Sequence, residues 1–308
     1  MREVLLIVNP SAGRGLAGRR WPAFERELRA AGADFDVELT CRPGQATELA
    51  REAVLAGRRV VGAVGGDGTL SEVANGFFEL GQPIPGRSRL AAVSLGTGGD
   101  FRRSFGLPTA PAAVAAMLLA GRSRRIDAGR VTCTGPAGER IVRHLVNVAD
   151  TGIGGEVLER VNGGFRVING EITYALAAAL TLLRWRNRPM HLVVDDQAFD
   201  LVAQQVVVAN CEYFAGGMRV APAAQPDDGL LDVVVAGDLG LVDNLRGMQR
   251  IRKGKHLDGR DPKIRHFHAR TVQVSSPTPL QVDVDGELPG ALPAVFEAMP
   301  GALELVVP

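Results

Sequence analysis

Three short loops rich in glycine carry most of the residues that could bind a phosphate group. They run from Asn9 to Gly15, from Gly65 to Thr69 and from Gly96 to Asp100, and each follows a run of apolar residues typical of a buried strand. Glycine lets backbone N–H groups approach an anion closely, and a helix that begins after the loop presents its positive end to the same anion. The loops therefore predict a binding site for a nucleotide phosphate chain.

The second loop also supplies a carboxylate, Asp67. An Asp-Gly pair normally joins two hairpin strands, whereas this one joins a predicted strand to a predicted helix, which favours a functional role. By contrast, Asn9-Pro10-Ser11 could equally be a turn and a helix cap. The sequence has no Walker A loop and no protein-kinase signature. A phosphate-binding loop that contains a carboxylate suits phosphoryl transfer assisted by magnesium.

The elements that must position these loops change in type along the chain. Up to about residue 120, predicted strands (4–8, 36–40, 59–64 and 90–94) alternate with helical patterns, which predicts a doubly wound parallel sheet whose loops gather at one edge. Later residues predict short strands with two helices, at 171–186 and 241–251, and thus a mainly antiparallel β-sandwich. We therefore expect an α/β domain over residues 1–128 and a β-rich domain over 129–308. The last strand, 303–307, could belong to either.

Composition excludes several classes of protein. The 308 residues include 35 Lys+Arg and 34 Asp+Glu, and this near-neutral balance gives no support for a nucleic-acid binder. Three cysteines, far apart and odd in number, argue against a disulfide framework or a zinc site. The start is too short for a signal peptide, and no apolar stretch reaches the roughly 20 residues needed to span a bilayer. These features predict a cytoplasmic protein whose membrane contact would be peripheral.

Taken together, four segments resemble a known family. Residues 8–13, 65–76, 95–101 and 284–287 are similar to the diacylglycerol kinase catalytic domain family, which includes sphingosine kinases and bacterial soluble diacylglycerol kinases. The similarity extends from residue 3 to the end, although the GGDG motif by itself is shared with NAD kinases. The resemblance implies a nucleotide-binding first domain, a lipid-binding second domain, and a kinase that uses ATP and Mg²⁺ to phosphorylate diacylglycerol or a related lipid.

The resemblance also implies the residues of each site. A structural magnesium is expected at Gln225, Asp228 and Leu230, two of which would bind it through main-chain oxygens; a plain turn is the alternative reading. The positions expected to surround ATP are Asn9, Ser11, Thr40, Gly66, Asp67, Gly68, Thr69, Glu72 and Thr97.

The general base is expected to be Glu287, which would take the proton from the lipid hydroxyl. Asp67 is the rival base, and we assign it instead to metal and phosphate binding. A hairpin turn at Asp285-Gly286 is the alternative reading of the segment around Glu287. A weaker expectation of a substrate contact or a metal-bound water network concerns Asp100, Asp127 and Glu156. The chain departs from the family pattern at Glu156, where relatives have Asp, and at Gly99, where most have Asn.

A basic segment, residues 246–270, contains nine Lys or Arg against two Asp. It could be a solvated face or a surface that attracts anionic lipid headgroups at a membrane. The segment also contains His256, His266 and His268; the HxH spacing hints at metal binding, but lone surface histidines are commoner.

Two other functions and one assembly state stay open at this point. The first is an NAD kinase, disfavoured by the segments at the beginning and near the end of the chain. The second is a catalytically idle regulator that binds nucleotide or lipid, supported by the departures at Gly99 and Glu156. A homodimer is compatible with the sequence.

Overall fold

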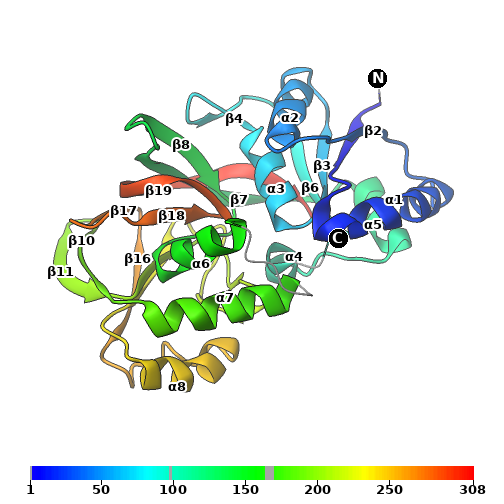
Figure 1. Ribbon diagram of the computed structural model, residues 1–308. Helices are drawn as coiled ribbons and strands as arrows, with labels where there is room; N and C mark the ends of the chain where they lie inside the picture. Colours follow the sequence, from blue (N-terminus) through cyan, green and yellow to red (C-terminus); the bar gives the residue numbers. More distant parts are fainter. Residues whose placement is uncertain (1, 97–98, 164–169) are drawn as a thin grey trace. The chain divides into compact units, whose positions relative to one another are not determined.

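The computed structural model describes residues 2–96, 99–163 and 170–308. Its contacts divide the chain into two compact units (Figure 1). The first unit contains Met1–Ala128 and Pro300–Pro308, and the second contains Gly129–Met299. The end of the chain thus packs with the first unit, and two strands, β7 (Ser123–Thr134) and β19 (Glu287–Val306), run from one unit into the other.

The first unit is built on a parallel sheet. Its strands are β1 (Val4–Val8), β2 (Asp36–Leu39), β3 (Val60–Gly65) and β6 (Arg89–Ser94), in the order β2-β1-β3-β6. The end of β19 lies next to β6, where Leu305 pairs with Leu90 in parallel. Every pair in this part of the sheet is parallel, which confirms the predicted α/β class.

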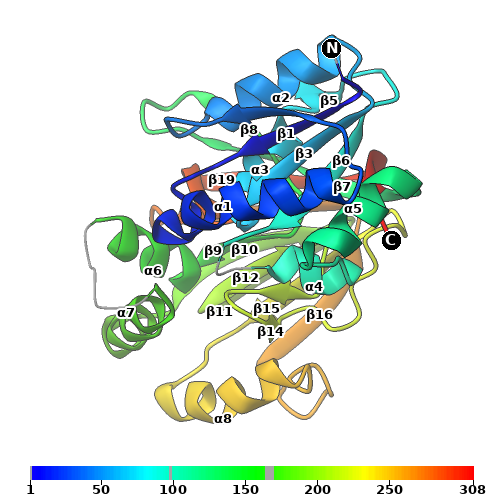
Figure 2. The ribbon, with the colours of Figure 1, turned by 90° about the vertical axis from the view of Figure 1, so that its right-hand side faces the viewer.

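Helices cover this sheet because their apolar residues recur at helical spacing. In α1 (Ala12–Ala30), the buried side chains include Trp21, Phe24 and Leu28, which lie on one face. Helix α1 packs against α5, and α2 packs against α3 (Figure 2). The further helices and short strands of the unit are α2 (Gln45–Leu55), α3 (Asp67–Asn75), α4 (Asp100–Phe105), α5 (Pro111–Ala120), β4 (Phe78–Glu79) and β5 (Gln82–Pro83).

The second unit is a β-sandwich-like domain of antiparallel strands, as predicted. One run of neighbours is β16-β15-β12-β9-β18-β19, and a second leads from β19 through β17 and β10 to β11, while β7 pairs with β8. Alternating apolar residues from these strands form its core. The bounds of the strands are β8 (Arg140–Leu145), β9 (Val148–Gly152), β10 (Arg188–Val194), β11 (Gln197–Ala203), β12 (Gln205–Ala209), β13 (Tyr213–Phe214), β14 (Met218–Arg219), β15 (Leu231–Ala236), β16 (Ile264–Ala269), β17 (Thr271–Ser275) and β18 (Gln281–Val284).

From the sequence, residues 141–148 are expected to form one strand, but they divide between two, β8 and β9. The break occurs because Val146, Asn147 and Val148 donate their backbone N–H groups to the carboxylate of Asp285 rather than to a neighbouring strand. A half-buried carboxylate that accepts three N–H bonds replaces the ladder at this corner. Only the tertiary fold brings Asp285 here, so the local sequence carries no sign of the break.

Three helices accompany the sandwich: α6 (Ile153–Asn162), α7 (Gly170–Arg184) and α8 (Leu241–Arg252). Asn244 of α8 exchanges two hydrogen bonds with Gln204, at 2.9 Å each, and Ile251 packs against a small apolar cluster of the sandwich. Within the residues that the structure describes, every helix is too short or too polar to cross a bilayer.

Candidate functional site

The three glycine loops lie together at the carboxyl edge of the parallel sheet. Parallel pairing brings Val8 level with Val64, and Val64 level with Val93, so β1, β3 and β6 end side by side. Backbone hydrogen bonds then join the loops: the N–H of Asn9 donates to the carbonyl of Val64, and the N–H of Gly96 donates to that of Gly65. Parallel strands thus bring together loops that are far apart in the sequence.

The side chain of Asn9 links the first loop to the second. Its Nδ2 donates to Oγ1 of Thr69 at 3.2 Å, and its Oδ1 accepts the N–H of Ser11 at 3.0 Å. The same loop bends at Gly13, Arg14 and Gly15, whose φ angles are 59°, 59° and 80°, so the regular part of α1 starts after them. Two glycines suit this left-handed stretch because they adopt positive φ without steric cost.

The glycines of the second loop, together with Gly96 of the third, fall into two physical classes. A Cβ on Gly65 would lie 2.4 Å from Oγ1 of Thr69, and Gly96 packs so closely on Gly66 that its Cβ would lie 3.2 Å from the Gly66 Cα. In contrast, a Cβ on Gly66 or Gly68 would meet no atom of the described residues within 4 Å. Packing therefore explains Gly65 and Gly96, whereas Gly66 and Gly68 have open space above the backbone as far as the described residues go.

Asp67 contacts the last two residues of the third loop. It is the first residue of α3, and its Oδ2 accepts the N–H groups of Gly99 at 2.8 Å and Asp100 at 3.1 Å. Gly99 has a φ of 135°, a conformation that a side chain disfavours, which gives a physical reason for glycine here. Of the predicted positions, Thr97 lies outside the described residues.

An ion pair and a small cavity lie next to Asp67. Asp100 is buried and pairs with Arg103 at 2.5 Å. A cavity of about 20 Å³ beside Asp67 is lined in part by Ser94, Phe101 and Arg102, and it has room for about one water molecule. It is too small for a phosphate, so a phosphate chain would have to lie over the loops.

Two other predicted nucleotide contacts also have structural roles. The N–H of Thr40, at the end of β2, donates to the carbonyl of Val8. Oε2 of Glu72 accepts the N–H of Ala46 at 3.2 Å in the first turn of α2, while Thr47 donates to the Glu72 carbonyl. Glu72 therefore holds α2 against α3.

Asp127, predicted to belong to a metal-bound water network, is buried in β7. Its Oδ1 accepts the N–H of Gly301 at 2.7 Å and so fastens the returning end of the chain within the first unit. A carboxylate acceptor strengthens such a bond. The geometry thus gives Asp127 an anchoring role in the described residues.

In the second unit, Glu287 begins β19 directly after a tight turn. Val284 pairs with Glu287, and the turn residues Asp285 and Gly286 have φ angles of 51° and 88°, so the segment is the hairpin that the Asp-Gly pair suggests. The side chain of Glu287 is half-buried. The predicted base, Glu287, therefore directly follows a hairpin turn.

A carboxylate pair, one member buried and the other half-buried, lies next to this turn, and sequence reasoning missed it. Asp150 on β9 and Asp283 on β18 are direct cross-strand partners. Burial raises the pKa of Asp150 to about 7. Burial, and then the nearby carboxylate of Asp150, raise the pKa of Asp283 well above its usual value, and Glu287 adds to this effect. One signal was available: each is a lone acid within an apolar strand.

The predicted magnesium segment is an exposed loop before β15. Oδ1 of Asp228 accepts the N–H of Leu230 at 3.0 Å, and Gly229 has a φ of 79°. A carboxylate beside main-chain carbonyls is the donor type that a hard cation prefers, so this loop fits magnesium chemically.

Glu156, a predicted substrate contact, lies in the first turn of α6, where Oε1 is 3.7 Å from Arg160. A negative side chain in the first turn favours the helix, and an exposed i,i+4 pair adds only a little stability. The longer side chain in place of the family's Asp therefore has a local partner on its own helix.

Family models match both parts of the chain. Residues 3–131 match the diacylglycerol kinase catalytic domain, and residues 147–307 match the YegS C-terminal NAD kinase beta sandwich-like domain. The chain belongs to the diacylglycerol kinase catalytic domain family. It is thus a kinase of this family, as the resemblance predicted.

Individual relatives agree with this assignment. A protein named diacylglycerol kinase from Staphylococcus saprophyticus subsp. saprophyticus is 28% identical over 307 residues, covering 100% of this chain and 96% of the relative. One of the same name from Bacillus subtilis (strain 168) is 26% identical over 309 residues, covering 100% and 97%.

Solved structures show the same fold. A crystal structure of a diacylglycerol kinase from Bacillus anthracis str. Sterne has a TM-score of 0.71 and 25% identity, covering 99% of this chain and 96% of the other. A yeast NADH kinase complexed with NADH has a TM-score of 0.57 and 11% identity, covering 100% and 84%, which is a likeness of fold only.

Proposed function

We propose that this member of the diacylglycerol kinase family transfers the γ-phosphate of ATP to the hydroxyl of diacylglycerol or a related lipid, with the help of Mg²⁺. The observation that carries the nucleotide part is the pair of glycines, Gly66 and Gly68, over which the described residues leave open space. Backbone N–H groups at the start of α3 can approach a phosphate there, and the helix presents its positive end to it. The relatives named diacylglycerol kinase support the lipid part.

Asp67 and Glu287 divide the chemistry in this proposal. Asp67 orients the phosphate chain and its magnesium, while its hydrogen bonds to Gly99 and Asp100 join the second loop to the end of the third. Glu287 takes the proton of the lipid hydroxyl as the hydroxyl oxygen attacks the γ-phosphorus and ADP leaves. A bound magnesium ion would supply charge stabilisation of the transferring phosphoryl group. The loop with Gln225, Asp228 and Leu230 offers the oxygen donors for a separate, structural magnesium.

The exposed face of α8 supports contact with a lipid surface. Leu241, Val242, Leu245 and Met248 follow one another at helical spacing and are 48–67% exposed. Asn244 and Ile251 of the same helix attach it to the sandwich. Two arginines of this helix, Arg246 and Arg252, add positive charge, whereas Arg250 pairs with Asp258. An amphipathic helix of this kind suits an anionic membrane surface, which extends the expectation for the basic segment 246–270.

Phosphoryl transfer from radiolabelled ATP to a panel of lipid hydroxyl acceptors tests the enzyme. The wild type should label diacylglycerol or a near relative, and Glu287→Gln and Asp67→Asn should each lower the rate about 10²-fold or more. Asp196→Asn, which removes an exposed carboxylate in the β10–β11 turn of the same unit as Glu287, is the matched control and should keep the rate. No labelling of any lipid by the wild type would refute the proposal.

The same assay separates the alternatives if NAD is added to the panel. Labelling of NAD with no labelling of lipid would identify an NAD kinase, a possibility that the likeness in fold to the yeast NADH kinase keeps in view. Binding of ATP without transfer to any acceptor would identify an idle regulator. Equal rates for wild type and Glu287→Gln would transfer the role of base to another residue.

A further inference from the structure

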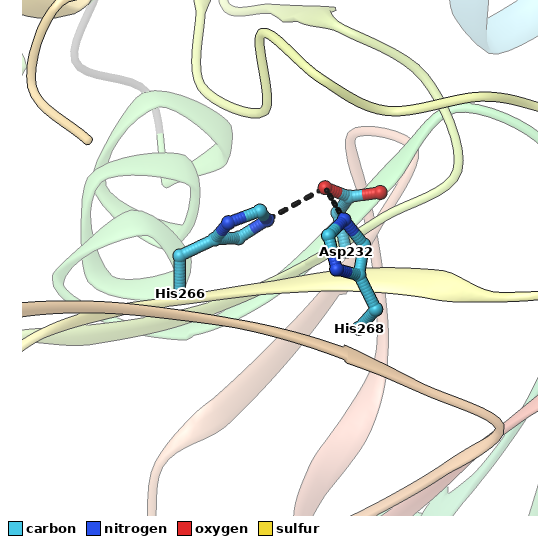
Figure 3. A group of neighbouring side chains, drawn as sticks. All are labelled: Asp232, His266 and His268. Atoms are coloured by element: carbon cyan, nitrogen blue, oxygen red, sulfur yellow. Dashed lines mark hydrogen bonds and ion pairs between the residues drawn. The ribbon is translucent and has the colours of Figure 1, made fainter. Parts of the chain in front are cut away.

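Two neighbouring strands of the second unit place one carboxylate and two imidazoles on the same face. β15 and β16 pair antiparallel, with Asp232 opposite His268 and Val234 opposite His266. Side chains two residues apart on a strand share a face, and directly opposed residues do so as well. Asp232, His266 and His268 therefore project together from the sheet (Figure 3). None of the three belongs to the residues assigned to phosphoryl transfer above.

The three ligating atoms lie close together. Oδ1 of Asp232 is 2.7 Å from Nε2 of His266 and 3.4 Å from Nε2 of His268, and all three ligating atoms lie within 4.8 Å of one another. In a tetrahedral zinc site with bonds of about 2.0–2.1 Å, neighbouring ligand atoms are about 3.3 Å apart. The two distances from Asp232 differ from this value by about 0.6 Å or less, and the distance between the two imidazole nitrogens differs by at most about 1.5 Å.

The burial of the three side chains is graded in a way that suits a bound cation. The Asp232 side chain is 3% exposed, that of His266 is 22% and that of His268 is 47%. β16 ends its run of neighbouring strands, so the cluster faces the protein on one side and solvent on the other. A buried carboxylate approached by two imidazole nitrogens attracts positive charge, and an ion could enter past His268.

We propose that Asp232, His266 and His268 form a binding site for a divalent transition metal, with Zn²⁺ the best fit. Imidazole nitrogen favours zinc, cobalt and nickel, whereas magnesium and calcium prefer oxygen ligands, so this site differs in chemistry from the predicted magnesium loop. Three protein ligands leave a fourth position for water on the exposed side. The ion would fasten the edge strand β16 to β15.

Zinc titration of the full-length protein, after treatment with a chelator and in excess Mg²⁺, tests the site by calorimetry. The wild type should bind one equivalent of Zn²⁺, and its Tm should rise with zinc. Co²⁺ in place of Zn²⁺ should give the intense visible absorption of a four-coordinate ion. His266→Asn and His268→Asn should each weaken Zn²⁺ binding at least tenfold and abolish the rise in Tm.

His191→Asn is the matched control, because His191 and Asp200 form a similar cross-strand pair, 2.8 Å apart, with a single histidine. It should bind zinc like the wild type. Absence of one-equivalent binding in the wild type would refute the site, as would zinc affinity unchanged in His268→Asn. Because His268 is half exposed, that variant should fold even if His266→Asn does not, and circular dichroism checks this.

Discussion

The glycine loops of the first unit and the paired polar side chains of the second place chemical groups by different physical means. In the loops, backbone N–H groups and one carboxylate come together because three parallel strands end at the same edge. In the second unit, Asp150 meets Asp283, and Asp232 meets His268, through antiparallel register. Each glycine loop is therefore a run of consecutive residues that the sequence shows as a motif. The polar pairs of the second unit instead join residues of two different strands.

The largest effect on stability is expected at Asp285 of the second unit, whose carboxylate accepts hydrogen bonds from the backbone. Asp285→Ala removes the acceptor of three N–H groups, from Val146, Asn147 and Val148. Without the charged acceptor, these three N–H groups lose their hydrogen bonds. The free energy of unfolding should then fall by about 3–5 kcal/mol, measured by urea denaturation. Asp285→Asn keeps one acceptor oxygen and tolerates the positive φ, so it should cost less.

Asp196→Ala is the control for that measurement, because Asp196 is exposed in the turn between β10 and β11. A loss below about 1 kcal/mol for Asp285→Ala would mean that solvent replaces the carboxylate at this corner. It would also remove the reason given for the break between β8 and β9.

The next effect depends on pH. The folded-state pKa of Asp150 is raised to about 7 by burial, and that of Asp283 is raised as well. Between about pH 4 and pH 7 the native state therefore binds more protons than the unfolded state, and its stability falls as pH rises. Asp283→Asn should raise the unfolding free energy by about 2 kcal/mol at pH 8, because it removes one charge from the pair.

At pH 4 the same substitution should change little, since both carboxyls are then protonated in the folded protein. Denaturation of wild type and variant across this range measures the difference between the two curves. Parallel curves would show that the two carboxylates do not share a buried environment. The prediction thus tests whether register, rather than local sequence, sets the electrostatics of the second unit.

Two adjacent glycines of the first unit should separate fold from ligand binding. Gly65→Ala places a Cβ 2.4 Å from Oγ1 of Thr69 and should cost about 1–3 kcal/mol of stability. Gly66→Ala meets no described atom within 4 Å and already has an extended backbone, so its stability should stay within about 0.5 kcal/mol of wild type. ATP affinity, by contrast, should fall about tenfold in Gly66→Ala if a phosphate lies over the loop.

Thermal unfolding and equilibrium binding of ATP read the two properties independently. An unchanged affinity in Gly66→Ala would place the nucleotide elsewhere. A stable Gly65→Ala would show that Thr69 can move aside. Either result would contradict the division of this loop into a glycine required for packing, Gly65, and a glycine that faces the ligand, Gly66.

These contrasts explain how much of the molecule could be predicted from the sequence. The α/β class of the first unit followed from alternating strand and helix patterns, and the family followed from motifs such as Gly65 to Thr69. The roles within that motif did not, because Gly65 and Gly66 are the same residue and only their three-dimensional neighbours differ. Likewise, the sequence marked His266 and His268 by their spacing, but Asp232 joined them only through strand pairing.

The smallest effect on stability is expected on the exposed face of α8. Leu245 is 67% exposed, so Leu245→Gln should change the unfolding free energy by no more than about 0.5 kcal/mol. Sedimentation with vesicles that contain anionic lipid should nevertheless show weaker binding, because the apolar stripe of an amphipathic helix supplies much of its membrane affinity. Added salt should weaken wild-type binding further by screening the arginines.

Leu55→Gln is the control for that experiment, since Leu55 is 59% exposed on α2 of the first unit. It should leave vesicle binding unchanged if lipid contact belongs to α8. Equal losses for the two variants would show that exposed leucines contribute without regard to position. Loss of vesicle binding only in Leu245→Gln would instead assign lipid contact to the second unit. The first unit would then bind nucleotide through its loop backbone, and the second would bind a lipid surface through side chains.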